Sequence, residues 1–451
     1  MDYFLSKLLR FPPKMKNHHL SEIVQGSAIA FILKGIGAVL SFILNIYVAR
    51  TLGVNDTGIF FLVITIIFVT ASLGRFGLDN VVIRKISSFS SEKKWREVKS
   101  VFKGSMVISM ILTAIFSLLL YIFSEWISIT IFKKPELVSS LKWMTIRIIP
   151  IAVISIVAES LKGLKKIASS QLIFNIGLPL VSIITLVLIP SYHNLHGLVT
   201  IWNLSAIIVM IVSVIIWVRT TNKYISTNSS PDYKILITSG YPLFVVMALN
   251  MIITWSSTIF LGVFSENTDV GIFNVAVRTA NLMNFLLVSV NAIAAPRFAE
   301  LYHSRNFKLL KLTAQDTTKL MFWLSLPVFV LVMLFSSEIM GLFGSQFRSG
   351  GTILTILIIS QFINVSTGSV GYLLIMSGQE KLLRNNIIFV AILNTILNIF
   401  LIPKYGIYGA VISSSGSLII QNIISLFIVR VKLNFWTISL FEKFSKLGNH
   451  G

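Results

Sequence analysis

Three basic residues, Lys34, Arg147 and Arg278, lie inside long apolar segments of the sequence. A basic residue near the middle of a membrane-spanning helix costs about 2.5 to 3.5 kcal/mol on insertion scales, so each of these positions needs a physical reason. Arg147 lies near enough to the end of its segment to reach the membrane surface, whereas Lys34 lies about ten residues, or about 15 Å, from the start of its helix. A water-filled cavity would remove most of this cost, and its fixed positive charge would attract an anion.

Polar side chains accompany these basic residues at helical spacing. At about 100° per residue, one face of the first segment holds Lys34 together with small or polar residues, namely Ser27, Ala30, Ala38, Ser41 and Asn45. The segment of Arg278 carries an arc of amides, namely Asn274, Asn281, Asn284 and Asn291, and the segment before it carries Asn250, Thr254 and Ser257. For single amides and hydroxyls the simpler interpretation is hydrogen bonding between helices. A stripe that includes a charge favours a hydrated cleft, whose predicted substrate-binding residues are Lys34, Arg278, Arg147, Asn45, Asn250, Asn274 and Asn281.

The composition around these residues is that of a multi-pass membrane protein. The chain has 451 residues, of which 55% are hydrophobic and 12% are charged, whereas about 25% of an average soluble domain is charged. Twelve apolar segments are long enough to cross a bilayer as helices, and the short alternating strands of a membrane barrel are absent. The predicted spans are 24–49, 58–74, 104–123, 141–160, 171–189, 197–217, 239–264, 271–295, 317–336, 352–376, 385–402 and 407–429.

The distribution of positive charge predicts the orientation of the chain. Most of the 38 Lys and Arg residues fall in the segments on one side of the twelve predicted spans, which places both termini in the cytoplasm. This bias accounts for most of the net charge of +21, so we do not expect a nucleic-acid partner. The first apolar segment is too long for a signal peptide and is expected to remain as the first helix.

Motifs for catalysis, metals or cofactors are weak in this sequence. There is no cysteine, and His193 and His196 in the stretch HNLH have no third metal ligand nearby. Glu159, beside Lys162, is interpreted as part of an ion pair at a helix end, and no Asp or Glu falls in the middle of a predicted span. The loops leave no room for a separate catalytic domain. The sequence therefore predicts a protein that is not an enzyme, with no catalytic residue, no metal site and no cofactor.

Short sequence echoes indicate an internal repeat. NDTGIF at 55–60 returns as TDVGIF at 268–273, and IPSY at 189–192 returns as IPKY at 402–405. GLKKIASSQLIF at 163–174 resembles GQEKLLRNNIIF at 378–389. The three echoes occur in the same order and at nearly the same spacing. An even number of spans per half gives both halves the same orientation, as in transporters built from parallel repeats.

The predicted architecture is an all-α integral membrane protein in which two six-helix halves form a V around a central cationic cleft. The predicted parts are a cytoplasmic N-terminal segment at 1–23, a first half at 24–218, a cytoplasmic linker at 219–238, a second half at 239–430 and a cytoplasmic tail at 431–451.

Several of these segments together resemble a known family. ARTLGVNDTGIFFLV from Ala49, the basic loop from Arg84 to Lys103, LKGLKKIASSQ from Leu161 and the late IPKYGIYGAVISSS are similar to the polysaccharide (O-antigen or capsule) flippases of the multidrug/oligosaccharidyl-lipid/polysaccharide transporter superfamily. The similarity covers nearly the whole chain in helix number, topology and loop placement.

The resemblance implies a flippase of the bacterial inner membrane that works by alternating access. Its cargo would be an undecaprenyl-pyrophosphate-linked oligosaccharide repeat unit for O-antigen, lipopolysaccharide or capsule synthesis. The pyrophosphate suits a cationic cleft. Lys34 and Arg278 stand where related lipid II flippases have cleft arginines, although position 34 holds lysine. Beyond the bilayer and this cargo, the resemblance implies transient contact with a polymerase and a chain-length regulator.

Three alternatives remain open from the sequence. The first is a lipid II or drug-export member of the same superfamily, although drug exporters tend to carry an acidic residue in the first or seventh helix. The second is an integral-membrane polysaccharide polymerase or ligase, which usually needs a larger outer loop than this chain has. The third is a structural membrane scaffold, which would not need a charged stripe.

Overall fold

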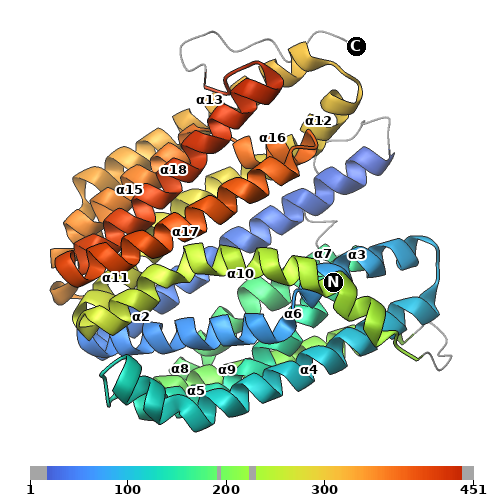
Figure 1. Ribbon diagram of the computed structural model, residues 1–451. Helices are drawn as coiled ribbons and strands as arrows, with labels where there is room; N and C mark the ends of the chain where they lie inside the picture. Colours follow the sequence, from blue (N-terminus) through green and yellow to red (C-terminus); the bar gives the residue numbers. More distant parts are fainter. Residues whose placement is uncertain (1–17, 190–193, 223–229, 439–451) are drawn as a thin grey trace. The chain divides into compact units, whose positions relative to one another are not determined.

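The computed structural model describes residues 18–189, 194–222 and 230–438 (Figure 1). Most of the predicted N-terminal segment, His193 and parts of the linker and tail lie outside these ranges. Throughout the described residues the regular structure is helical, without strands. The all-α class predicted from the sequence is confirmed.

The described part of the chain has eleven helices that are long and apolar enough to cross a membrane. The first of them, Ile29–Arg75, contains 47 residues, about 70 Å of helix and more than twice the thickness of a hydrocarbon core. Its regular backbone is interrupted at Gly53, where φ is 71°, a conformation that glycine adopts without a steric penalty. If this helix is counted as two spans, one on either side of Gly53, the described residues contain twelve spans, the number predicted from the sequence.

The chain divides into two compact units, 1–251 and 252–451. The first contains α2 (His18–Arg75), α3 (Leu78–Ser91), α4 (Trp95–Trp126), η1 (Ile127–Ile131), α5 (Leu137–Met144), η2 (Thr145–Arg147), α6 (Ile148–Gly163), α7 (Ile167–Gln171), η3 (Leu172–Gly177), α8 (Leu178–Leu188) and α9 (Leu195–Thr221). The division falls inside α10 (Tyr233–Phe264), after the predicted linker.

The second unit continues from α10 in a similar order of long and broken helices. It contains α11 (Asn267–Ala280), η4 (Asn281–Met283), α12 (Asn284–His303), α13 (Phe307–Leu334), α14 (Ser336–Gly341), η5 (Ser345–Gly350), α15 (Gly351–Ser366), α16 (Val370–Met376), α17 (Glu380–Tyr405) and α18 (Ile407–Leu433).

Two of the sequence echoes lie at corresponding places in the two units. The first pair follows the break at Gly53 in α2 and the turn before α11. The pair GLKKIASSQLIF and GQEKLLRNNIIF contains the turns before α7 and α17, where Lys165 and Gly378 both have a positive φ. The pair IPSY and IPKY falls partly outside the described residues. The echoes therefore mark turns between helices, where the backbone conformation restricts the residue type.

The apolar core of the first unit is built around α6, which is buried on almost every side. Val157 and Leu161 of α6 pack with residues of α3 and α4. The sequence analysis predicted only a basic loop between the second and third spans. The structure shows that this segment also contains the helix α3. Its Leu78, Val82 and Ile86 are fully buried, and this helical spacing was the signal that could have predicted it.

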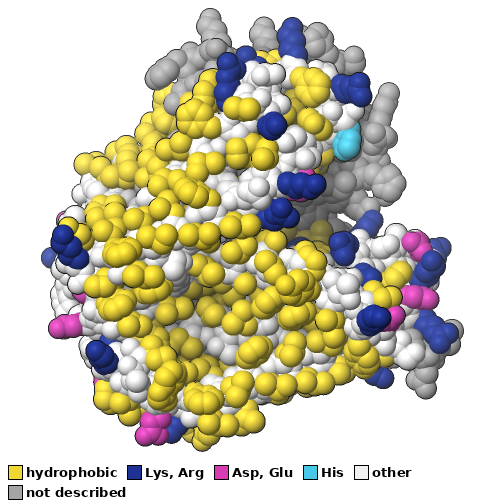
Figure 2. Space-filling view, in the orientation of Figure 1, with side chains coloured by type: hydrophobic (Ala, Val, Ile, Leu, Met, Phe, Trp, Pro, Cys, Tyr) yellow, Lys and Arg dark blue, Asp and Glu magenta, His cyan; other side chains and the backbone are white. Residues whose placement is uncertain are grey.

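Large apolar side chains remain exposed along the helices in both units. Leu118 on α4 is 60% exposed, and Leu334 on α13 and Phe400 on α17 are each 71% exposed. Figure 2 shows such side chains spread over the helices, with Lys, Arg, Asp and Glu gathered toward helix ends. So much exposed apolar surface is unusual for a soluble monomer and is expected for helices that face lipid.

In the second unit, amides and hydroxyls join α10, α17 and α18. Asn394 of α17 accepts hydrogen bonds from Ser256 at 2.6 Å and from Asn398 at 3.0 Å, and it donates to Ser417 at 3.1 Å. Asn394 and Asn398 are completely buried. This is the interhelical hydrogen bonding expected of polar residues that face other helices in a membrane.

We expect Asn394→Ala to lower the free energy of unfolding by about 1 to 3 kcal/mol, because it leaves Ser256 and Ser417 buried without these partners. Thermal unfolding of the purified protein in detergent measures the effect. Asn55→Ala is the control, because the exposed Asn55 side chain bonds, among the described residues, only to its neighbour Asp56. Equal stability of the two variants would contradict a structural role for Asn394.

Candidate functional site

Arg147 is placed by a break between two helices of the first unit. It ends the 3₁₀ turn η2, which separates α5 from α6. Pro150 follows in the first turn of α6 and has no N–H, so the carbonyl of Ile146 loses its usual helical donor. The nearby carbonyl of Thr145 accepts a hydrogen bond at 3.0 Å from the hydroxyl of Ser117 on α4. Arg147 therefore lies at the end of a short 3₁₀ turn that interrupts the α-helix.

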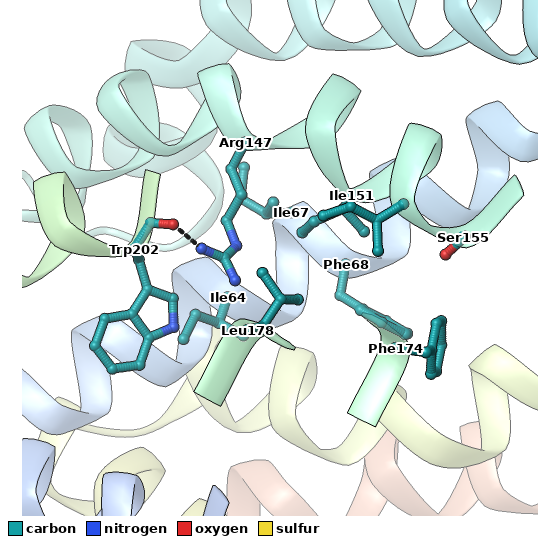
Figure 3. A pocket seen from close by; sticks show the side chains of 10 residues that line it. Ile64, Ile67, Phe68, Arg147, Ile151, Ser155, Phe174, Leu178 and Trp202 are labelled. Atoms are coloured by element: carbon teal, nitrogen blue, oxygen red, sulfur yellow. Dashed lines mark hydrogen bonds between the residues drawn. The ribbon is translucent and has the colours of Figure 1, made fainter. Parts of the chain in front are cut away.

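The guanidinium of Arg147 lies at one end of a small apolar pocket (Figure 3). The arginine is only 7% exposed, and its Nη1 donates to the backbone carbonyl of Trp202 on α9. The pocket has a volume of about 180 Å³. Its other lining residues come from α2, α6, η3 and α8, and they are Ile64, Ile67, Phe68, Ile151, Ile154, Ser155, Phe174 and Leu178.

No carboxylate lines the Arg147 pocket, and Arg147 forms no ion pair with the residues that the structure describes. A buried cation with one carbonyl partner is electrostatically costly. Apolar walls strengthen the attraction between this cation and an anion that replaces water. The pocket therefore has the chemistry to bind a negatively charged group that carries an apolar substituent.

Lys34 and Asn45 lie on α2, also in the first unit. Lys34 is exposed and Asn45 is half-buried, while the adjacent Leu33 packs on Ala168 and Ile176. The backbone of Asn175 lies close to Gly37, where a larger side chain would collide with it.

Asn250 lies on α10 and is exposed, and its amide donates to the carbonyl of Val246 one turn earlier. Neither Lys34, Asn45 nor Asn250 lines the pocket of Arg147. Within the first unit the structure therefore does not bring the predicted residues into one pocket.

Arg278 and Asn274 lie one turn apart on α11 in the second unit. Arg278 is half-buried, whereas Asn274 is 3% exposed. The Asn274 amide donates to the carbonyl of Val270 at 2.9 Å and accepts from Thr258 of α10 at 3.5 Å. The hydrogen bonds of Asn274 are therefore used in helix packing, the interpretation that the sequence left open for single amides.

Asn281 is part of a group of four amides at the break between α11 and α12. Its carbonyl oxygen accepts from Gln361 at 2.7 Å and from Asn284 at 3.3 Å, and Asn364 donates to Asn284 at 2.8 Å. The 3₁₀ turn η4 presents Asn281 and Asn284 to α15, which carries Gln361 and Asn364. Asn281 is nevertheless exposed, so it can also bind a ligand.

The sequence analysis missed three polar features that the structure shows. Gln361 and Asn364 are one turn apart in an apolar segment, the same signal that identified Asn281. The other two features are buried ion pairs, Arg75 with Asp79 at 2.7 Å and Lys319 with Asp316 at 3.9 Å. Asp316 precedes the predicted ninth span by one residue, but α13 begins at Phe307 and so includes it.

His196, considered from sequence as half of a metal motif, accepts a hydrogen bond from the Trp143 indole at 3.0 Å. Among the described residues, no group of three His, Cys, Asp or Glu side chains is close enough to hold a metal ion.

Comparison with protein families gives two matches. A family described as polysaccharide biosynthesis protein matches residues 23–302, and the MatE family matches residues 242–401.

Two archaeal proteins are similar over most of the chain. An uncharacterized membrane protein of Methanocaldococcus jannaschii is 23% identical over 403 residues, which cover 84% of this chain and 78% of that protein. The probable low-salt glycan biosynthesis flippase Agl15 of Haloferax volcanii is 21% identical over 420 residues, which cover 89% of this chain and 82% of that protein.

Solved structures of two transporters share the fold. The lipid II flippase MurJ, in an inward closed conformation, has a TM-score of 0.72 at 18% identity, covering 90% of this chain and 89% of that one. An inward-facing multidrug resistance transporter of the MATE family has a TM-score of 0.70 at 15% identity, covering 90% and 98%. At these identities the likeness shows the fold alone.

We expect Arg147→Met to leave the free energy of unfolding unchanged or to raise it by about 1 kcal/mol, because it removes a buried charge that has no ion-pair partner. Arg75→Met is the matched variant, since it leaves Asp79 largely buried without its cation and should cost about 3 to 5 kcal/mol. Thermal unfolding in detergent measures both. Similar losses in the two variants would show that Arg147 is needed for folding, and the case for an anion site would fail.

Proposed function

The chain belongs to the polysaccharide biosynthesis protein family, and from this we propose that it is a flippase that moves a lipid-linked oligosaccharide across the membrane. The observation that carries the proposal is the family match over residues 23–302, which includes Lys34, Arg147 and Arg278. A relative with the same proposed class of activity is named as a glycan biosynthesis flippase.

The finer proposal concerns the cargo. We propose an undecaprenyl-pyrophosphate-linked repeat unit for O-antigen or capsule synthesis in the bacterial inner membrane, carried by alternating access with both termini in the cytoplasm. A pyrophosphate accepts short charge-assisted hydrogen bonds from Lys and Arg, and a lipid tail stays in the bilayer. The named glycan flippase relative is archaeal, so it supports a glycan cargo without specifying this lipid.

Each predicted residue has a role in this proposal. Lys34 and Arg278 bind the pyrophosphate, and Arg147 binds an anionic group against an apolar wall. Asn281, the exposed Asn250 and the half-buried Asn45 hydrogen-bond the cargo. Asn274 supports Arg278 by fixing α11 against α10.

A second candidate is drug export, favoured by the MatE match over residues 242–401. An exporter of cationic compounds needs carboxylates in its binding cavity, whereas the pocket of Arg147 contains a cation and no acidic side chain. Complementation distinguishes the two candidates, since an exporter would not restore surface polysaccharide.

We expect the double variant Lys34→Ala and Arg278→Ala to reduce glycan export by about tenfold or more, because each lost charge-assisted hydrogen bond is worth about 1.5 to 3 kcal/mol. Surface polysaccharide is measured in a flippase-null strain that expresses the protein at normal level. Lys308→Ala is the control, since Lys308 is exposed at the start of α13. Normal polysaccharide in the double variant would sink the role assigned to these two residues, and failure of the wild type to complement would sink the cargo.

A further inference from the structure

We propose that a cavity inside the second unit binds one uncharged sugar ring. The cavity has a volume of about 200 Å³ and is bounded by α12, the break between α15 and α16, α17 and α18. Its thirteen lining residues are Leu287, Asn291, Asn364, Gly368, Ser369, Val370, Gly371, Tyr372, Leu383, Leu418, Gln421, Asn422 and Ser425. The site is separate from the pocket of Arg147, which belongs to the first unit.

Two residues that line this cavity each have a buried oxygen atom without a hydrogen-bond partner among the described residues. These atoms are the amide oxygen of Asn291 and the hydroxyl of Ser369, in residues that are 4% and 5% exposed. A buried polar atom without a partner costs about 1 to 3 kcal/mol. Both atoms are almost inaccessible to solvent, so each side chain must rotate for a ligand hydroxyl in the cavity to reach them.

Other polar groups of the cavity are held in fixed orientations. Asn422 accepts from Thr367 at 3.3 Å and donates to the carbonyl of Leu418 at 2.9 Å. The hydroxyl of Ser425 accepts from Asn386 at 2.9 Å. Because helix packing sets their positions before a ligand arrives, these groups lose little conformational entropy on binding.

The wall also contains Gln421 and Tyr372. Gln421 is half-buried and Tyr372 is 44% exposed. Their side chains carry hydrogen-bonding groups at less buried positions, so they can adjust to a bound ligand. Tyr372 adds an apolar ring.

The chemistry of the wall selects the ligand class. Its polar side chains are amides and hydroxyls, which both donate and accept hydrogen bonds, as sugar hydroxyls do. None of the thirteen lining residues is charged, which argues against a phosphate or a divalent cation. Leu287, Val370 and Leu418 supply apolar surface for the C–H groups of a ring. The volume is below the range of about 300 to 1,000 Å³ typical of drug-sized ligands, which fits a single ring.

This inference rests on the proposed function for the source of the sugar, since a glycan cargo would supply it. The same chemistry would bind a free monosaccharide. Direct binding and export in cells therefore test the site separately.

Gly371→Leu is the test variant, because a Cβ at Gly371 meets no atom within 4 Å and a larger side chain would fill the cavity without backbone strain. Gly416→Leu is the matched control, because Gly416 on α18 has the same open surroundings and does not line the cavity. Asn291→Ala is a second variant, which keeps the cavity open and removes one unpaired acceptor.

Binding is measured by saturation-transfer NMR with free glucose, galactose, N-acetylglucosamine and N-acetylgalactosamine. The purified full chain is kept in a detergent without a sugar headgroup. We expect ring-proton signals from at least one sugar with the wild type and with Gly416→Leu, and at least a fivefold loss with Gly371→Leu and Asn291→Ala. No signal from any sugar, or equal signals with all variants, would overturn the proposal and leave the cavity as a hydrated void.

Export in the flippase-null strain separates this site from the flippase proposal. Loss of polysaccharide with Gly371→Leu but not with Gly416→Leu supports the sugar site. Normal export with Gly371→Leu overturns its role in transport while the flippase proposal stands. If the wild type does not complement, the flippase proposal fails, and the NMR result alone decides whether the site binds sugar.

Discussion

The structure depends on one constraint, which is that hydrocarbon offers no hydrogen-bond partner to a polar group. Regular helices satisfy this constraint for the backbone, so an irregular turn inside a span depends on the helices around it. At η2 the hydroxyl of Ser117 on the neighbouring helix α4 donates to the carbonyl of Thr145. At η4 the side-chain amides of Asn281 and Asn284 accept hydrogen bonds from Gln361 and Asn364, which ties the turn to α15. The breaks that place Arg147 and Asn281 are thus stabilised by the helices around them, as in transporters whose sites are built on discontinuous helices.

The same constraint separates polar residues that hold helices together from those available to a ligand. Asn394 and Asn398 are fully buried and bonded to their neighbours, so they have little capacity left. Asn291 is nearly as buried and lines a cavity, but its amide oxygen has no partner among the described residues. Burial alone does not distinguish these roles. The decisive observation is whether each donor and acceptor already has a partner.

This distinction explains how much could be predicted from the sequence. Hydrophobic length fixes the spans, because the thickness of the bilayer is known in advance, and the break at Gly53 is consistent with the two segments predicted there. The charged residues inside the spans could also be identified from the sequence. The hydrogen-bond partners of the polar residues could not, because those partners lie on helices that are distant in the sequence. Asn274 and Asn281 share one helical stripe, yet one is buried in packing and the other is exposed. Periodicity gives the face of a helix but not its neighbour.

The two halves of the internal repeat share the positions of their turns but not the positions of their charged residues. The spacing that relates residue 55 to residue 268 would pair Arg278 with Thr65, Arg147 with Ser360 and Lys34 with Met247. None of the three basic residues has a charged counterpart. The two halves share residues at turns, where the backbone conformation restricts the residue type. Their charged side chains differ. The second unit holds an uncharged cavity of amides and hydroxyls, and the first holds an apolar pocket with a cation. A cargo with an anionic group next to a lipid and an uncharged glycan offers a reason for this difference, since one pair of identical sites would suit only one end of such a molecule.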